Sequence, residues 1–228
     1  MIDAIIVPQG AEYKAVKKGL SSIKVKQPLI ITIPIGTRNI SAALTNHNFW
    51  RFKPKQVLMM GLCGSLSTQY SVGDAVIYQD CYSATKATKI LIDKRLNQLI
   101  IQKFNNYINQ NKVSFVSSIT CDRVVSTAKE KQQLARQFNV DVVDMESFDY
   151  INLLQQKKIA VSVIRIVSDD IKSDLPNLDR AIDESGKIKP LAMTKAMIEK
   201  PLASAKFIRG SIQGLQKLQQ LTTKLFCD

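Results

Sequence analysis

The sequence is poor in the residues that bind metals and form disulfides. It has one histidine and four dispersed cysteines in 228 residues, so we expect no metal, and free thiols in a reducing cytosol. No stretch approaches the ~20 apolar residues that a membrane span needs. The first residues, Met1-Ile2-Asp3, also lack the basic and apolar regions of a signal peptide. The sequence therefore predicts a cytoplasmic protein.

Acidic residues are scarce as well. The chain has 19 Asp and Glu but 32 Lys and Arg, which gives a formal net charge of +13. With 45% hydrophobic and 22% charged residues, the composition is that of a globular protein and excludes a disordered or collagen-like chain. The positive excess has two explanations. It attracts an anionic partner, such as nucleic acid, a phosphorylated substrate or a lipid surface, or its lysines simply solvate the surface.

Glycine is infrequent and unevenly distributed. Six of the nine glycines lie in the first 73 residues, and the next one is Gly186. Because glycine lets the backbone approach a ligand closely and adopt positive φ angles, we expect the N-terminal half to supply most of the backbone around a ligand.

Short apolar runs alternate with longer amphipathic ones along the first 170 residues. The apolar runs predict strands, mostly buried on both faces, at residues 2–7, 29–35, 56–60, 74–78, 113–119, 140–143 and 159–167. The amphipathic runs predict helices at residues 12–20, 39–48, 90–111, 127–137 and 146–156. This alternation predicts a single α/β domain over residues 1–228, with a mixed central sheet flanked by helices. In such sheets ligands bind where strands end.

The C-terminal segment, residues 187–228, is a basic extension of that domain. Its eight basic residues stand against two acidic ones, so it holds six of the thirteen excess positive charges. Apolar residues recur every three or four positions and predict one stripe on a long helix. The stripe docks on the sheet or on a second subunit, or it lies on an anionic membrane. Its members are Leu202, Ala205, Ile208, Ile212, Leu215, Leu218, Leu221 and Leu225.

Polar groups follow the first and third predicted strands. Glu12 comes shortly after the first strand, and the third leads into Cys63 and Gly64. Each has a structural explanation, because a first-turn glutamate complements a helix dipole and the pair Gly61 and Gly64 suits a tight turn. The functional interpretation is that they face a ligand at the sheet edge.

Two later strands also end in charged residues. Asp144 and Glu146, two residues apart, would point the same way on a strand, and burying both is costly unless they bind hydroxyl groups or a cation. Alternatively, Asp144 is an N-cap with Glu146 in the first helical turn. Arg165 lies inside an apolar run and needs a partner unless it is exposed on an edge strand, and Asp169 at that strand's end can act as an acid.

These motifs, in this order, resemble the nucleoside phosphorylase/nucleosidase superfamily. The resemblance covers residues 1 to about 170, and its most specific parts are three ordered segments. It implies a phosphorylase/hydrolase-like fold with a partly barrel-like sheet, and cleavage of the N-glycosidic bond between ribose and a nucleobase by phosphate or water. The segments are Leu62-Cys63-Gly64 through Val72-Gly73-Asp74, then Val143-Asp144-Met145-Glu146, and Arg165-Ile166-Val167-Ser168-Asp169.

The resemblance implies a role for each candidate. Asp169 is the acid that protonates or hydrogen-bonds the purine N7, and Ser168 orients it. Glu146 binds the ribose hydroxyls and stabilises an oxocarbenium-like ring, with Met145 beneath the sugar. The other expected substrate-binding residues are Cys63 and Gly64 beside the base, Val124 and Val125 against adenine, and Asp144 and Arg165. The family usually has a glycine where Cys121 stands.

The same comparison favours water over phosphate. The family's phosphorylases hold phosphate at positions that here read Glu12, Met59 and Leu62, and a glutamate repels phosphate. Glu12 instead matches the residue that activates water in the adenosyl-nucleoside hydrolases, although those enzymes have a serine at the position of Leu62. Arg38 could supply a phosphate contact, so a phosphorylase with phosphate as co-substrate is the alternative. No other cofactor is implied.

The tail resembles the hopanoid-associated branch of this superfamily, which implies adenosylhopane as substrate and peripheral membrane contact through residues 187–228. Methylthioadenosine and S-adenosylhomocysteine are the competing substrates, and the family implies a homo-oligomer. A noncatalytic nucleoside- or nucleic-acid-binding protein is the alternative of another class. We expect no nucleic-acid partner, because the basic residues lack interleaved aromatics. The tail's motifs are Ser173-Asp174-Leu175-Pro176, the run from Asp183 to Ala192, and Glu199-Lys200-Pro201.

Overall fold

The computed structural model describes residues 2–21, 23, 27–36, 40–45, 49–105, 113–178, 181, 183, 186 and 189–227. Its strands are β1 (Ala4–Pro8), β2 (Leu29–Ile33), β3 (Gln56–Ser65), β4 (Ala75–Ser83), β5 (Thr88–Leu91), β6 (Ser114–Thr120), β7 (Val142–Asp144) and β8 (Ala160–Asp169). Its helices are α1 (Ala11–Leu20), α2 (Ile40–Thr45), α3 (Phe49–Phe52), α4 (Lys94–Asn105), α5 (Ala128–Phe138), α6 (Ser147–Gln156), α7 (Pro190–Glu199) and α8 (Pro201–Phe226).

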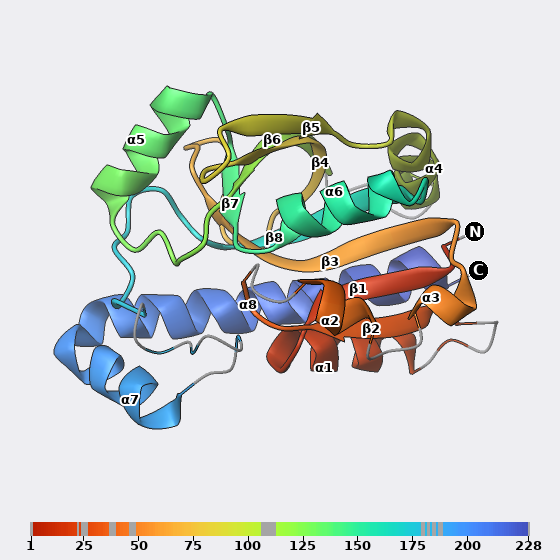
Figure 1. Ribbon diagram of the computed structural model, residues 1–228. Helices are drawn as coiled ribbons and strands as arrows, with labels where there is room; N and C mark the ends of the chain where they lie inside the picture. Colours follow the sequence, from red (N-terminus) through yellow and green to blue (C-terminus); the bar gives the residue numbers. More distant parts are fainter. Residues whose placement is uncertain are drawn as a thin grey trace.

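The strands form one mixed sheet that closes partly into a barrel. The order is β2-β1-β3-β7-β6-β4-β5, and β8 pairs with both β3 and β4. The circuit through β3, β7, β6, β4 and β8 is therefore closed, while β1 and β2 extend from β3 (Figure 1). The β3–β8 pair is parallel and the β4–β8 pair is antiparallel. This confirms the predicted α/β fold with a mixed, partly barrel-like sheet.

Helices cover both faces of the extended part of the sheet, as the alternation of strand residues requires. Ile5 of β1 and Leu58 of β3 pack with Leu20 of α1 in one core cluster. Their neighbours Ile6 and Met59 belong to another, which includes residues of α2, α3 and α6. The strands are thus buried on both faces, in agreement with their continuous apolar runs.

One predicted helix is wrong at its start. The predicted helix at 90–111 begins only at Lys94, because Thr88–Leu91 forms β5, paired antiparallel with β4 across a turn in which Ala87 has a φ of 48°. The end of that helix, and residues 46–48 of the predicted helix at 39–48, lie outside the described residues.

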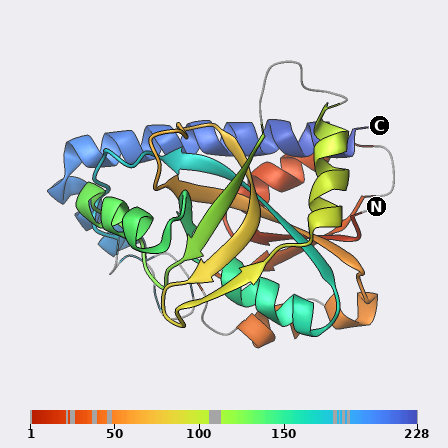
Figure 2. The same ribbon diagram turned by 90° about the horizontal axis from the view of Figure 1, so that it is seen from above.

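The C-terminal helix α8 lies along α1 and the sheet (Figure 2). Leu218, Leu221 and Leu225 are buried there, in the same core cluster as α1. Further toward its N-terminus the packed face is made of small residues instead. A Cβ at Gly210 would lie 2.1 Å from the carbonyl oxygen of Ser168, and Gly214 packs on Leu62.

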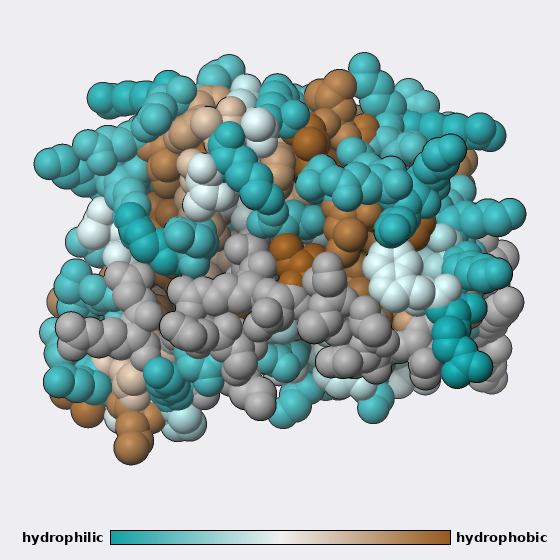
Figure 3. Space-filling model, in the orientation of Figure 1, coloured by the Kyte–Doolittle hydropathy of each residue, from teal (hydrophilic) through white to brown (hydrophobic). Residues whose placement is uncertain are grey.

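The predicted apolar stripe is therefore not one buried face. Its C-terminal part docks on the sheet as predicted, but Leu202, Ile208 and Ile212 are 82%, 43% and 52% exposed. The physical reason is that the small residues of α8 allow closer backbone packing than leucines would. Helix α7 also carries exposed apolar side chains, and this apolar surface lies at the lower left of Figure 3. None of the helices in the described part of the chain is long and apolar enough to cross a bilayer.

Candidate active site

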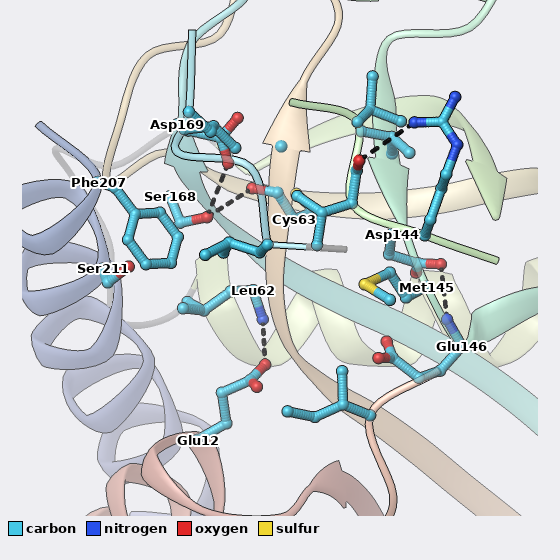
Figure 4. A pocket seen from close by; sticks show the side chains of 18 of the residues that line it. Glu12, Leu62, Cys63, Asp144, Met145, Glu146, Ser168, Asp169, Phe207 and Ser211 are labelled. Atoms are coloured by element: carbon cyan, nitrogen blue, oxygen red, sulfur yellow. Dashed lines mark hydrogen bonds between the residues drawn. The ribbon is translucent and has the colours of Figure 1, made fainter. Parts of the chain in front are cut away.

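A cavity of about 220 Å³ lies where β3, β7 and β8 end, bounded by the start of α1 and by α8 (Figure 4). Ten of the eleven candidate site residues predicted from the sequence line it, and the eleventh, Arg165, is buried beside Glu12, Asp144 and Glu146. The ten are Glu12, Cys63, Gly64, Val124, Val125, Asp144, Met145, Glu146, Ser168 and Asp169.

Glu12 enters the cavity from the first turn of α1. Its Oε1 accepts a hydrogen bond from the backbone N–H of Leu62 at 2.7 Å, and Arg165 Nη1 lies 3.9 Å away. Burial raises the pKa of the Glu12 carboxyl group, while Arg165 opposes that shift. A Cβ at Gly61 would lie 2.2 Å from Arg165 Nη1 and 2.6 Å from Glu12 Oε1, so this glycine makes room for the pair.

Arg165 is not a surface residue of an edge strand, because its side chain is only 1% exposed. Its Nη2 lies 3.4 Å from Asp144 Oδ2 and 3.5 Å from Glu146 Oε2, and it donates to Ser147 Oγ at 3.0 Å. The partner that the sequence required is thus a set of carboxylates at the same sheet edge.

Asp144 is the most enclosed of these acids. Its oxygens accept hydrogen bonds from Thr120 Oγ1 at 2.7 Å and Tyr78 OH at 3.1 Å, and from the hydroxyl and backbone N–H of Ser147. The predicted N-cap at Asp144 is wrong, because Asp144 ends β7 and Glu146 is the N-cap of α6. Asp144 still accepts from the first backbone N–H of that helix, and it pairs with Arg165 beneath the cavity.

Glu146 faces the cavity at the start of α6 and accepts a hydrogen bond from the backbone N–H of Gly36 at 3.0 Å. Burial raises its pKa from the ordinary 4.5 to about 7, although Arg165 opposes the shift. One guanidinium group faces three carboxyl groups here, those of Glu12, Asp144 and Glu146. The site therefore favours protons or a cationic ligand.

Asp169 ends β8 on another wall of the cavity. Its Oδ2 accepts a hydrogen bond from Ser168 Oγ at 3.1 Å, and that hydroxyl also lies 3.2 Å from the carbonyl oxygen of Cys63. Its Oδ1 pairs with the ammonium group of Lys131. Burial raises the pKa of Asp169, while Lys131 and Ser168 act against the increase. A Cβ at Gly64 would lie 2.9 Å from Asp169 Oδ1, so a side chain at this position would crowd the carboxyl group.

The sequence did not predict the wall that the C-terminal helices contribute. Met193 of α7 and Phe207 and Ser211 of α8 line the cavity beside Leu175 and Leu178. Phe207 belongs to neither the predicted stripe nor a motif, and an aromatic residue on a basic helix gives by itself no signal of a site. Lys131, one of many lysines on predicted helices, was missed for the same reason.

A family model described as the Phosphorylase superfamily matches residues 7–199 of this sequence. The chain belongs to this superfamily. The match spans β3, β7, β8 and the loop after β6, which together carry most of the cavity lining. A comparison with curated protein sequences gives no significant match.

Solved structures of similar fold include several nucleosidases. A 5′-methylthioadenosine/S-adenosylhomocysteine nucleosidase candidate from Borrelia burgdorferi B31, bound to adenine, has a TM-score of 0.72 at 16% identity, over 99% of this chain and 98% of that one. Futalosine hydrolase of Helicobacter pylori strain 26695 has a TM-score of 0.63 at 16% identity, over 92% and 96%. The Campylobacter jejuni 5′-methylthioadenosine/S-adenosylhomocysteine nucleosidase has 0.63 at 15%, over 90% and 98%. At these identities the likeness shows the fold shared with the superfamily.

Proposed function

We propose that this superfamily member hydrolyses the N-glycosidic bond of a purine nucleoside, with an adenosyl compound as substrate. The observation that carries the proposal is the placement of carboxyl groups on separate walls of one cavity, Glu12 on α1, Glu146 at the start of α6 and Asp169 at the end of β8 (Figure 4). The nucleosidases among the similar folds support the reaction class.

The proposed reaction divides the chemistry between these groups. Asp169 donates a proton to the departing base as the C–N bond breaks and its electron pair moves to the base. Glu12 accepts a proton from the water whose oxygen bonds to the anomeric carbon. Glu146 binds the ribose hydroxyls, and its carboxylate, once ionised, stabilises the positive charge that develops on the sugar ring. Ser168 orients Asp169, and Asp144 holds Arg165.

Water is favoured over phosphate by the charge of the cavity wall. The described lining has four acidic residues and one basic one, Arg123, which is itself paired with Glu130. Met59 is buried in the core, and Leu62 offers only an apolar side chain to the cavity. Arg38, the sequence's candidate for a phosphate contact, lies outside the described residues. Phosphorolysis is therefore the alternative reaction that the experiments must distinguish from hydrolysis.

Two isosteric substitutions test the roles. We expect Glu12→Gln and Asp169→Asn each to lower kcat/KM for base release by about 100-fold or more, the usual contribution of a general acid or base. Glu199→Gln, an exposed acid on α7, is the matched control and should behave as wild type. The assay is mass spectrometry of incubations with adenosine, methylthioadenosine, S-adenosylhomocysteine and an adenosyl lipid. Normal turnover in either variant would contradict the assignment, and nucleoside binding without base release from any substrate would favour a noncatalytic binding protein.

We propose further that the substrate carries a lipid, such as adenosylhopane, and that α7 and the start of α8 contact an anionic bilayer. Leu191, Ile198 and Leu202 are 88%, 73% and 82% exposed, and Lys195 and Lys200 are exposed among them. Apolar side chains ringed by lysines suit the surface of an anionic membrane. The same two helices line the cavity, so a bound membrane would lie next to the proposed site.

Vesicle flotation tests this contact. The protein should float with vesicles that contain anionic lipid and much less with zwitterionic ones. The double variant Leu191→Ser and Leu202→Ser should lose binding, whereas Leu91→Ser, which removes a leucine 63% exposed on β5, should retain it. Equal flotation of both variants would refute membrane contact at this surface. A change of the double variant from dimer to monomer in light scattering, without any flotation of the wild type, would instead assign the surface to a homo-oligomer.

A further inference from the structure

Lys131 is a charged residue in the protein interior to which the proposed reaction assigns no role. It belongs to α5, and its side chain is 0% exposed. No other lysine in the described part of the chain is buried. Burying a lysine side chain is unfavourable unless its ammonium group is paired. The contacts of Lys131 therefore indicate its role.

Those contacts all lie at the end of β8. The ammonium group donates a hydrogen bond to Asp169 Oδ1 and another, at 2.7 Å, to the carbonyl oxygen of Asp170. Ser168 Oγ holds the other oxygen of Asp169, Oδ2, at 3.1 Å. The carboxyl group is therefore fixed from both sides, by a charged group at one oxygen and a neutral hydroxyl at the other.

The position of Lys131 is itself held by the loop that follows Asp169. The backbone N–H of Ala128, in the first turn of α5, donates to Asp174 Oδ1 at 2.9 Å. The backbone N–H of Leu175 donates to the carbonyl oxygen of Ser126 at 2.7 Å. Thr127 caps the helix by accepting from the backbone N–H of Glu130. The start of α5 and residues 170–175 thus form one hydrogen-bonded unit around the Lys131–Asp169 pair.

Lys131 is also the cation that acts most strongly on Asp169. Arg123 lines the same cavity but is paired with Glu130. Asp170 in the following loop and the Cys63 thiol on β3 also act on this carboxyl group. Neither of them stabilises a negative charge on Asp169. An acid that gives its proton to a leaving base becomes a carboxylate, and in a buried site that carboxylate needs a nearby positive charge.

We propose that Lys131 is the positioning residue of Asp169: its ammonium group aims the carboxyl group into the cavity and stabilises the carboxylate that remains when the proton passes to the leaving base. The inference rests on the proposed nucleosidase function. The proton goes from Asp169 to the base, and the carboxylate of Asp169 stays paired with the ammonium group of Lys131. After the base has left, solvent returns a proton to Asp169.

Substitutions at Lys131 test the proposal. Lys131→Met fills the same space without charge, Lys131→Gln keeps a hydrogen-bond donor without charge, and Lys131→Arg keeps the charge. Lys129→Met, at an exposed lysine of the same helix, is the matched control. We expect the Met and Gln variants to lower kcat by about 10- to 100-fold, as for the loss of one hydrogen bond to a charged group, with KM changed little. Lys131→Arg should recover part of the loss.

The pH profile separates a positioning role from a merely structural one. Without the ammonium group Asp169 keeps its proton to higher pH, so the alkaline limb of kcat/KM should move to higher pH in Lys131→Met and Lys131→Gln but not in Lys129→Met. In an Asp169→Asn background the same substitutions should have little further effect, because the residue they act through is gone. An unmoved alkaline limb, or an equal loss in the Asp169→Asn background, would overturn the proposal.

A titration of the carboxyl group tests Lys131 separately from catalysis. In protein labelled with ¹³C at the aspartate carboxyl groups, Asp169→Asn identifies the NMR signal of Asp169. Its pKa should be higher in Lys131→Gln than in the wild type, and an unchanged value would overturn the proposal even in an active enzyme. If the wild type released no base from any nucleoside, the proposed function would fail while this titration still reported on the pair.

Discussion

At the scale of single residues, the site depends on one buried arginine shared by several acids. Arg165 lies within 3.9 Å of Glu12, Asp144 and Glu146, and Gly61 leaves the space in which they meet. A single positive charge cannot balance three carboxylates in a site shielded from water. Accordingly the pKa of Glu146 is raised to about 7, and a developing positive charge on a sugar would relieve the same imbalance.

This imbalance predicts a pH dependence of stability. The folded protein keeps Glu146 protonated up to about pH 7, whereas the unfolded chain ionises it near 4.5. Because the folded state binds more protons between these values, the stabilisation present below pH 4.5 is lost as the pH rises through 7. Glu146→Gln cannot ionise, so it should make the decline in the free energy of unfolding from pH 5 to pH 7 smaller.

Urea unfolding of the wild type and of Glu146→Gln at intervals between pH 5 and pH 7 measures this effect. Glu199→Gln, exposed on α7, is the control and should decline as the wild type does. The burial of Glu12 and Asp169, whose pKa values are also raised, leaves a residual decline in Glu146→Gln. Identical declines in all three proteins would show that Glu146 is not held protonated.

The sequence identified most of the cavity lining because those residues stand at strand ends in motifs of fixed order. Glu12, Asp144 and Asp169 could be found in this way. Lys131 and Phe207 could not, since each lies in a helix whose sequence is rich in other lysines or apolar residues. Which of several similar side chains reaches a site depends on how the helix packs, and no local pattern records that.

At the scale of elements, helix α8 acts as both a support and a wall of the site. Gly210 and Gly214 bring its backbone against Ser168 and Leu62, at the ends of β8 and β3. This close approach places Phe207 and Ser211 in the cavity lining (Figure 4). The periodic apolar stripe predicted that its own large side chains would be the packed face of this half of the helix. Hydrophobic periodicity does not detect a contact made through glycines.

A methyl group at Gly210 tests that contact. The added Cβ of Gly210→Ala would lie 2.1 Å from the carbonyl oxygen of Ser168, so α8 or the end of β8 must shift. We expect a loss of about 1–3 kcal/mol in the free energy of unfolding, the usual range for overpacking, together with reduced kcat/KM because Ser168 and Asp169 move. Gln216→Ala, exposed on the same helix, should change neither quantity. A Gly210→Ala variant as stable and active as wild type would show that α8 does not fix these residues.

At the scale of the whole molecule, a strongly basic chain encloses an acidic cavity. The net charge of +13 first suggested an anionic partner, yet four of the five charged residues in the described lining are acidic. Apart from the buried Arg165 and Lys131, the positive charge of the described chain is on the outside, and much of it is on α7 and α8 beside exposed leucines and isoleucines. The overall charge is therefore a poor guide to the chemistry of the cavity, which follows from the local charge of its lining.

We propose that water, and not phosphate, cleaves the glycosidic bond. The most direct measurement is base release from an adenosyl nucleoside in ¹⁸O-labelled water, with and without phosphate, followed by mass spectrometry of the sugar product. We predict that the free sugar carries one ¹⁸O atom at its anomeric carbon and that the rate does not depend on phosphate. A product of ribose-1-phosphate type, formed only when phosphate is present, would contradict it.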